Sequence, residues 1–348
     1  MTASKKIYYV IEPESWVIRE EGLCIRNYMR KVFNINIEIL PVSERKLKKI
    51  KNSVIHFGSK NLYMPEIFRV IDESNKIILT WYHGTDEDVK YIKLIPEIMP
   101  KIDILHTSCS ISKDNLLRWG VPENKIIIIP IGVETRNFNK SDEDQRKNLK
   151  LKIGVPENSI CIGSFQKDGD GWGEGLNPKL IKGPDIFCDA IIEINKKYPV
   201  FVLLTGPARG YVKNRLSESG VAFKHFYLKK YSELPKYFKA IDYYFITSRA
   251  EGGPKALMES FSSGIPLVST DVGMVHDYCQ DKINAMICPA EDTGCIVNKF
   301  EELHKDEVLK KKIIENGLDT VKELDWLVVI KSYYEKIYSR YLQVNNDD

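Results

Sequence analysis

Long apolar runs are missing from this chain, because no stretch among its 348 residues approaches the length needed to span a bilayer. The apolar run nearest the N-terminus, IYYVI, is too short for a signal peptide and is followed at once by an acid and a proline. We therefore expect a cytoplasmic protein, with any membrane contact peripheral and on the inner face of the membrane.

Cysteine pairs and a strong charge of one sign are missing as well. The seven cysteines form no C-x-x-C pair and show no ligand-like spacing with histidine, which fits reduced thiols. The formal net charge of +3 gives no reason to expect nucleic acid as a partner. A basic cluster at 45–51 could touch an anionic membrane surface, although a solvated helix face or loop is the favoured interpretation.

The glycine fingerprint of dinucleotide-binding enzymes is the third absence. The first apolar run, at 7–11, is followed by EPESW and not by G-x-G-x-x-G. This counts against an NAD-dependent Rossmann enzyme.

Short apolar runs separated by helix-like stretches are abundant. They lie at 7–11, 35–40, 53–58, 76–83, 103–108, 125–132, 159–165, 200–206, 223–228, 242–248, 265–270 and 285–290. Such β-branched runs predict parallel sheets covered by helices on both faces. The charged stretch at 139–152 separates the first six apolar runs from the last six. We therefore predict two Rossmann-like α/β domains facing each other, with the ligand site in the cleft between them.

The segment at 248–273, SRAEGGPKALMESFSSGIPLVSTDVG, carries the clearest chemical signal. Gly252, Gly253 and Pro254 form a loop with little side-chain bulk, and Pro254 suits the first position of a helix. The amides of such a helix start can approach a diphosphate. Glu251 and Glu259 flank the loop with carboxylates that can accept from hydroxyl groups, which together indicate a nucleotide-sugar site.

Glu251 and Glu259 also reproduce an E-x7-E pattern, and with SGIPLVSTDVG at 263–273 and IIPIGVETRNF at 128–138 the chain resembles glycosyltransferase family 4. The resemblance implies a GT-B fold of two facing Rossmann-like domains. It assigns 1–152 to an acceptor-binding domain, 153–325 to a nucleotide-sugar donor domain, and 326–348 to a helix that returns to the first domain. In residues 324–342 the helical spacing of the apolar positions independently predicts an amphipathic helix.

The resemblance also implies a basic pair that binds the donor diphosphate. Its second member matches Lys182 in LIKGPD, and a lysine just before a helix is a sound phosphate ligand. The first member is Lys167 or Lys179, because the sequence between them is longer and richer in glycine than the family pattern; Lys167 is preferred. The intervening DGDGWGEG lacks the oxygen ligand at Trp172 that a calcium loop needs, so no metal site is predicted there.

Other candidate residues follow strand ends. His83 matches the family's active-site histidine and is expected near the donor sugar, with a structural histidine as the alternative. Arg209 is expected to meet the donor phosphate or base, with a salt bridge as the alternative. Arg249 is expected to pair with Glu251. The family's Gly-Gly loop after the first strand is replaced by IEPESWVIREEG, in which Ser15 can cap a helix beginning at Trp16.

These residues predict a retaining glycosyltransferase that needs neither a metal nor a cofactor. It would move a sugar from a nucleoside-diphosphate sugar to a hydroxyl of a glycan, a lipid-linked glycan or a small acceptor, in surface polysaccharide or glycoconjugate synthesis. Glu251, His83 and Lys182 are the expected catalytic residues. The alternatives are a GT-B-fold sugar-nucleotide epimerase, for which no convincing acid and base pair appears in the first half, and an inactive sugar-nucleotide-binding module.

Overall fold

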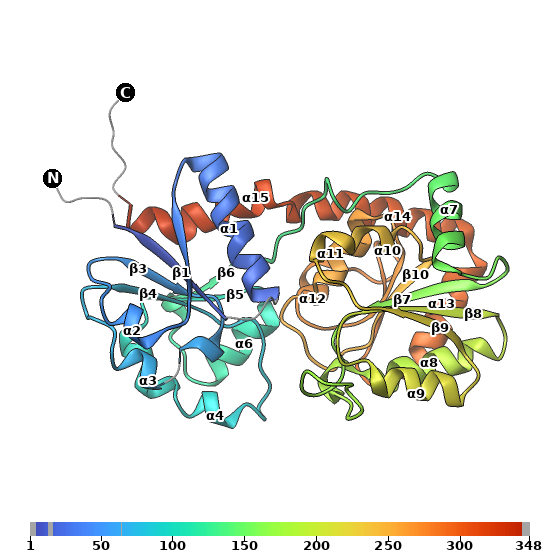
Figure 1. Cartoon of the computed structure of the whole chain (residues 1–348), viewed down its shortest axis with the longest axis horizontal. Helices are drawn as coiled ribbons and strands as arrows, with labels where there is room; N and C mark the ends of the chain where they lie inside the picture. The colour runs from blue at the N-terminus through green and yellow to red at the C-terminus, as the bar shows by residue number, and fades with distance from the viewer. Residues whose placement is uncertain (1–4, 13–16, 64, 343–348) are drawn as a thin grey trace. The chain divides into compact units, whose positions relative to one another are not determined.

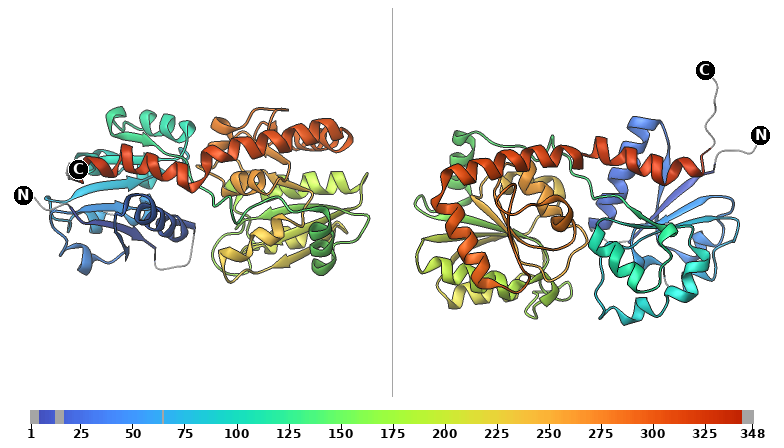
Figure 2. Two further views of the ribbon diagram at one scale, coloured as in Figure 1. Left: turned by 90° about the horizontal axis from the view of Figure 1, so that it is seen from above. Right: turned by 180° about the vertical axis from the view of Figure 1, so that it is seen from behind.

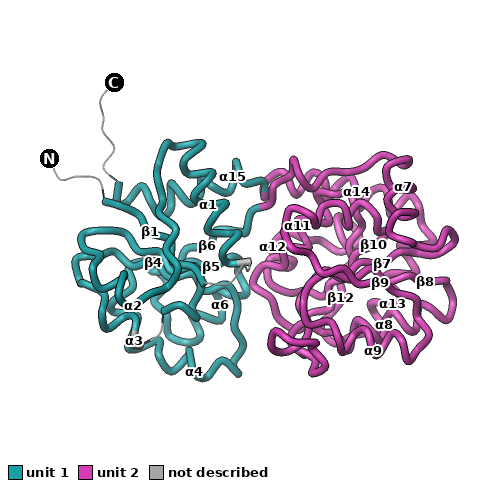
Figure 3. The backbone as a smooth tube through the Cα atoms, in the orientation of Figure 1, with its two compact units in different colours: residues 1–132, 325–348 teal, residues 133–324 magenta. Residues whose placement is uncertain are grey.

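The computed structural model describes residues 5–12, 17–63 and 65–342. The chain divides into two compact units (Figure 3): unit 1 combines residues 1–132 with 325–348, and unit 2 spans 133–324. Each unit contains a parallel six-stranded sheet, so the predicted α/β class with two Rossmann-like folds is confirmed. Ser15 and Trp16, the expected first-domain cap and helix start, lie outside the described residues.

The sheet of unit 1 has the strand order β2-β1-β3-β4-β5-β6, which extends the order of flavodoxin-like folds by one strand. Every neighbouring pair is parallel. The strands are β1 (Ile7–Ile11), β2 (Ile37–Pro41), β3 (Val54–Phe57), β4 (Lys76–Thr80), β5 (Ile104–Thr107) and β6 (Ile126–Ile128).

Helices cover both faces of this sheet (Figure 1). Successive strand residues point to opposite sides, so apolar side chains lie on both faces and pack against helices there. On one face Ile7 and Tyr9 pack in a core with the first and the last helix, and on the other Val10 joins a core with the helices between them. The helices are α1 (Val17–Phe33), α2 (Glu44–Leu47), α3 (Pro65–Phe68), α4 (Val89–Ile92), α5 (Ile95–Ile98), α6 (Ser110–Arg118) and α15 (Trp326–Lys336).

The C-terminal segment completes the core of unit 1. Helix α15 runs beside α1 (Figure 2), and Trp326 stacks on Tyr28 with ring centroids 5.9 Å apart. A Cβ at Gly132 would lie 2.6 Å from the Trp326 ring, so this close packing requires glycine. The amphipathic helix predicted from the sequence is therefore present, and its buried side belongs to the first unit.

A chain of buried hydrogen bonds ties the turn after α15 to the sheet. The Tyr338 hydroxyl lies 2.7 Å from His56 Nδ1, and His56 Nε2 lies 2.8 Å from Thr80 Oγ1. Thr80 Oγ1 lies 3.1 Å from His106 Nδ1, and His106 Nε2 lies 3.0 Å from the Ile129 carbonyl oxygen. Because that carbonyl can only accept, His106 carries its proton on Nε2 when both histidines are neutral. Tyr338 then donates to His56, His56 donates to Thr80, and Thr80 donates to His106.

The sheet of unit 2 has the order β12-β11-β10-β7-β8-β9, the doubly wound order of dinucleotide-type Rossmann folds. The strands are β7 (Ile160–Phe165), β8 (Val200–Thr205), β9 (Ala222–Phe226), β10 (Tyr243–Ile246), β11 (Leu267–Thr270) and β12 (Met286–Cys288). Helices α8, α9 and α13 pack on one face, and α11 packs against β10 and β11. The helices are α7 (Glu143–Ile153), α8 (Pro184–Asn195), α9 (Gly210–Glu218), α10 (Pro235–Phe238), α11 (Lys255–Ser262), α12 (Met274–Tyr278), α13 (Thr293–Lys305) and α14 (Glu307–Thr320).

The boundary between the units lies at 132/133, twenty residues before the one expected at 152/153. Residues 133–152 belong to unit 2 because their side chains and carbonyls are bound there. Lys150 contacts both carboxylate oxygens of Asp242 at 2.6 and 2.7 Å, and Ser262 donates a hydrogen bond to the Phe138 carbonyl. Such pairings across a hundred residues leave no trace in the local charge pattern that suggested a linker.

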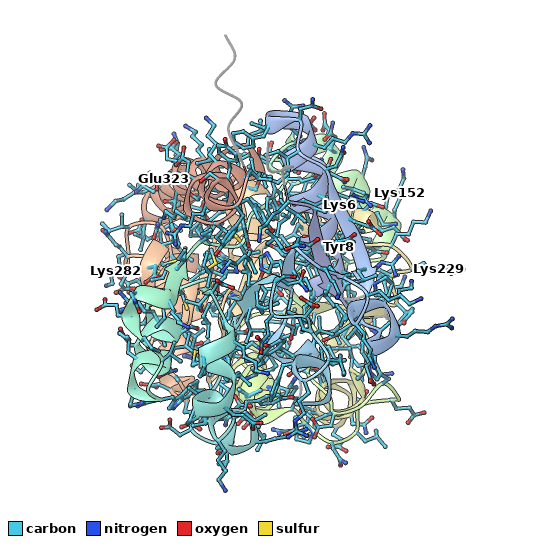
Figure 4. The ribbon with its side chains drawn as sticks, turned by 90° about the vertical axis from the view of Figure 1, so that its left-hand side faces the viewer. Lys6, Tyr8, Lys152, Lys229, Lys282 and Glu323 are labelled. Carbon is cyan, nitrogen blue, oxygen red and sulfur yellow. The ribbon has the colours of Figure 1, made fainter. Side chains whose placement is uncertain are left out.

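Charged side chains project from the surface of each unit (Figure 4), among them the exposed Lys6, Lys152, Lys229 and Lys282. Positive charge is therefore spread over several elements. Among the described helices, none combines the length and the apolar character required to cross a membrane.

Candidate functional site

The switch point of the unit 2 sheet lies between β7 and β10, because the chain builds β8 and β9 on one side of β7 and then returns to the other. In open α/β sheets, ligands bind outside the carboxyl ends of the strands at such a point. The loop after β7 carries Lys167, Lys179 and Lys182, and the loop after β10 carries Ser248 and Glu251. The sequence-predicted residues of the second half therefore gather at one end of one sheet.

An ion pair joins the two loops. The Lys182 ammonium lies 2.6 Å from Oε1 and 2.7 Å from Oε2 of Glu251, and the Ser248 hydroxyl donates to Oε1 over 2.9 Å. The Glu251 side chain is 7% exposed and that of Lys182 is 22% exposed. The pair thus combines a nearly buried carboxylate with a cation that keeps access to solvent.

Gly183 makes this pairing possible. Its φ is +60°, and a Cβ there would overlap the Thr247 carbonyl oxygen. The Thr247 hydroxyl in turn donates to the Gly183 carbonyl over 2.8 Å, and the Arg249 amide donates to the Ile181 carbonyl over 2.9 Å. Only glycine allows this contact between the two loops, and the contact places Lys182 against Glu251.

Residues 252–254 form the last part of the loop that connects β10 to helix α11. The helix begins at Lys255, one residue later than predicted, and Pro254 precedes it in an extended conformation. The Gly252 carbonyl accepts from the Met274 amide over 2.9 Å. A Cβ at Gly273 would also overlap the Gly252 oxygen, so a glycine lets α12 approach this loop closely.

Glu259 lies inside α11 and is 3% exposed. Burial raises the pKa of its carboxyl to about 7, although the hydrogen bond from the Tyr231 hydroxyl and the nearby Lys255 ammonium oppose this shift. Lys255 also lies 5.1 Å from the centre of the Tyr231 ring. A buried carboxylate near neutral pKa needs donors, and ligand hydroxyls are one source of them.

Lys179 and Lys167 both stand near Lys182. The pKa of Lys179 is lowered by burial first and then by repulsion from Lys182 and Lys167, so both of these ammonium groups act on Lys179. Lys167 packs on Trp172, with its ammonium 4.2 Å from the ring centre, and Trp172 is 59% exposed. The structure brings both candidates for the second lysine to the site without separating their roles.

Arg209 does not reach into the site, which corrects its predicted role in donor binding. Its side chain is fully buried, with Nε 3.1 Å from Asp168 Oδ1. Its terminal nitrogens donate to the Ser164 hydroxyl and to carbonyls of Ser164, Gln166 and Thr205 over 2.8 to 3.1 Å. The salt bridge weighed as the alternative is the arrangement found, and Arg209 supports the loop after β7 from beneath.

Arg249 also has partners other than the expected one. It binds both carboxylate oxygens of Asp185 at 2.9 and 2.7 Å and Glu291 at 2.6 Å. Asp185 lies in the first turn of α8, so Arg249 fastens the end of β10 to that helix. Glu251 forms its ion pair with Lys182 and not with Arg249 as expected.

His83 lies in unit 1, three residues after the end of β4, and its side chain is exposed. Its carbonyl accepts from the Lys60 ammonium over 2.9 Å, and Lys60 also binds Asp88 at 3.0 Å. The loop that carries the imidazole is therefore held by the short 3-10 helix Lys60–Leu62 that follows β3. Unlike His56 and His106, which are completely buried, His83 presents its side chain at the surface.

Three residues of the site escaped the sequence reasoning: Ser248, Tyr231 and Asp168. Nothing in the spacing of Tyr231 reveals its contact with Glu259 across 28 residues. Asp168 belongs to the glycine-rich stretch that resembled a calcium loop. The pairing of Asp168 with Arg209 was likewise not predictable, because the two residues lie 41 positions apart in the sequence.

Comparisons with known proteins find that this chain is similar to glycosyltransferases. The family model "Glycosyl transferases group 1" matches residues 176–320. The chain is 26% identical over 285 residues to N-acetyl-alpha-D-glucosaminyl L-malate synthase from Bacillus anthracis, covering 78% of this chain and 69% of that protein. It is 24% identical over 201 residues to the lipopolysaccharide core biosynthesis mannosyltransferase LpsB from Rhizobium meliloti (strain 1021), covering 55% and 54%. The chain thus spans little more than half of LpsB.

Among solved structures, HepE from Anabaena in complex with UDP and glucose superposes with a TM-score of 0.79. The superposition covers 96% of this chain and all of HepE at 14% identity, so the likeness is one of fold. Together with the two Rossmann-like units, it confirms the predicted GT-B class.

Proposed function

We propose that the protein is a glycosyltransferase, because its residues 176–320 match the family model of the group 1 glycosyl transferases. It moves a sugar from a nucleoside-diphosphate sugar to a hydroxyl of an acceptor. The observation that carries the proposal is the Lys182–Glu251 ion pair at the switch point of unit 2, with buried Glu259 on the adjoining helix. A cation paired with one carboxylate, and a second carboxylate buried in the helix that follows, complement a ligand that joins phosphates to hydroxyl groups.

Lys182 binds the donor diphosphate together with a second lysine. Lys167 remains the preferred partner because it directly follows β7, and Lys179 is the alternative because its ammonium neighbours Lys182 within a half-buried site. Ammonium groups held near the leaving diphosphate stabilise the negative charge that develops as the sugar departs. Backbone amides of Gly252 and Gly253 add donors on the opposite side of that charge.

The carboxylates hold the hydroxyl groups. Glu251 accepts hydrogen bonds from hydroxyl groups of the transferred sugar. Glu259 accepts hydrogen bonds from the ribose hydroxyl groups, which partly replace the Tyr231 hydroxyl as its donors. His83 of unit 1 positions the sugar or donates to one of its hydroxyls. These roles need no metal or cofactor, so a chelator should leave turnover unchanged.

The proposed transfer retains the configuration of the anomeric carbon. The bond between that carbon and the β-phosphate oxygen breaks, and a bond to the acceptor oxygen forms on the same face. The acceptor proton passes to the departing phosphate oxygen, so the products are the glycoside and the nucleoside diphosphate. No carboxylate needs to act as a base in this scheme, which agrees with the engagement of Glu251 by Lys182 and Ser248.

The acceptor class is a glycan, a lipid-linked glycan or a small hydroxylated molecule. LpsB, named for lipopolysaccharide core synthesis, supports a surface glycan, and the L-malate synthase supports a small acceptor. The setting we propose is the cytoplasm, at the inner face of the membrane. There the five exposed basic residues at 45–51 would meet anionic lipid, which co-sedimentation with phosphatidylglycerol and phosphatidylcholine vesicles can compare.

The proposal is tested by product analysis with UDP-, GDP- and ADP-sugars against a panel of glycan, lipid-linked and malate-like acceptors. A glycosyltransferase yields a glycoside with the donor's anomeric configuration, together with equimolar nucleoside diphosphate. A donor converted to its epimer without an acceptor would show the epimerase alternative instead. Binding of a nucleotide-sugar without any turnover would show an inactive binding module.

A further inference from the structure

The Glu251 carboxylate is fixed beside the phosphate-binding lysine. Both of its oxygens contact the Lys182 ammonium, and Ser248 holds one of them from the other side. Gly183 packs against Thr247, so the two loops that carry this pair cannot separate without losing that contact. A phosphate bound to Lys182 therefore comes to lie near the Glu251 carboxylate.

The substrate and the product of the proposed reaction differ in how they meet such a carboxylate. In a nucleoside-diphosphate sugar, the terminal phosphate is esterified, and the sugar offers hydroxyl donors. In the nucleoside diphosphate, the terminal phosphate has a second ionisation with a pKa of about 6, so it carries close to one more negative charge at neutral pH. Glu251 can accept hydrogen bonds from the first ligand, whereas it repels the second.

The surrounding cations do not provide this discrimination. Lys182, Lys179 and Lys167 attract the phosphates of both ligands, and they favour the product because of its larger charge. Ser248 is neutral. Glu251 is a carboxylate in direct contact with Lys182, and its negative charge favours the sugar-bearing ligand.

We propose that Glu251 makes the site select the nucleotide-sugar over the nucleoside diphosphate, and so promotes release of the product once the sugar has left. This inference rests on the proposed function, because it uses the same ligand at the same site. It gives the carboxylate a second task besides holding the sugar.

The test measures affinities by calorimetry for three pairs: UDP and UDP-glucose, GDP and GDP-mannose, and ADP and ADP-glucose. The variant Glu251→Gln keeps the shape of the side chain and removes its charge. For the pair that binds, the ratio of nucleoside-diphosphate affinity to nucleotide-sugar affinity should rise at least about tenfold, equal to 1.4 kcal/mol. The increase should come largely from tighter binding of the nucleoside diphosphate.

Two further variants separate charge from structural damage. Glu251→Asp keeps the charge, so it should keep the weak binding of the nucleoside diphosphate. Glu193→Gln removes a carboxylate from the surface pair with Lys196, and its affinity ratio should match that of the wild type.

An unchanged ratio in Glu251→Gln, with nucleotide binding intact, would overturn the inference and leave the proposed function standing. The same rise in Glu251→Asp as in Glu251→Gln would also overturn it, because charge would then not be the cause. If none of the six ligands binds the wild-type protein, the proposed function itself fails.

Discussion

At the scale of a single residue, we expect Glu259 to make ligand binding depend on pH. Its pKa is raised by burial to about 7, so its carboxyl is largely ionised at pH 8 and largely protonated at pH 6. A hydroxyl donates a stronger hydrogen bond to the ionised form. Ribose binding should therefore favour high pH, and it should weaken as the pH falls through 7.

We expect the affinity for a nucleotide-sugar to drop several-fold between pH 8 and pH 6. The nucleotide-sugar is the right probe, because its esterified phosphates stay ionised over this range. In Glu259→Gln, which cannot ionise, the affinity should be lower at pH 8 and nearly independent of pH. A wild-type profile as flat as that of the variant would exclude the carboxylate from the binding site.

At the scale of elements, the loop between β7 and α8 is held by a buried ion pair. Asp168 and Arg209 are both almost fully inaccessible, and burial raises the pKa of Asp168 even though Arg209 opposes the shift. The loop residues Glu174 and Gly175 also accept from the Gly210 and Tyr211 amides at the start of α9, over 2.7 and 2.8 Å. The pair therefore fixes the stretch that carries the lysines.

Arg209→Met should lower the free energy of unfolding of unit 2 by about 3–5 kcal/mol, because it leaves Asp168 buried without its cation. Urea unfolding followed by circular dichroism measures this. Arg215→Met is the matched control: Arg215 binds Asp189 at the surface, and losing an exposed pair costs about 0–1 kcal/mol. Equal losses in both variants would show that the buried pair has no special role.

The elements themselves were largely predictable, since each of the twelve apolar runs contains or overlaps a strand. Strand formation depends on the apolar pattern and composition of neighbouring residues, and short β-branched runs are typical of strands in α/β folds. The partners of Arg209 and Arg249 were not predictable, because Asp168, Asp185 and Glu291 stand 41 to 64 residues away from them. The same holds for the unit boundary, because Lys150 pairs with Asp242, 92 residues away.

At the scale of the whole chain, the C-terminal turn is bound to the sheet of unit 1 through two buried histidines. Burial lowers the pKa of His56 well below its usual value and that of His106 to about 4. The unfolded chain, with pKa values near 6.5, therefore binds more protons than the folded one below that pH. The stability that neutral histidines provide is complete above pH 6.5 and is lost as the pH falls toward 4.

We expect the free energy of unfolding of unit 1 to fall between pH 7 and pH 5, as urea titrations at successive pH values would show. Tyr338→Phe removes the donor to His56 and should cost about 1–3 kcal/mol at pH 7. His276→Asn, at an exposed histidine paired with Asp271, should keep the wild-type pH profile. A stability independent of pH over this range would contradict the neutral hydrogen-bond chain.

The central claim, that unit 2 binds a nucleoside-diphosphate sugar through Lys182 and Glu251, is tested most directly by thermal unfolding with UDP-, GDP- and ADP-sugars. One of them, at 100 times its dissociation constant, should add about 2.7 kcal/mol and raise the midpoint of unit 2 by about 5–10 °C. The double variant Lys182→Gln, Glu251→Gln removes both charges together, and it should lose most of this shift. No shift with any nucleotide-sugar, or an equal shift in the double variant, would contradict the account.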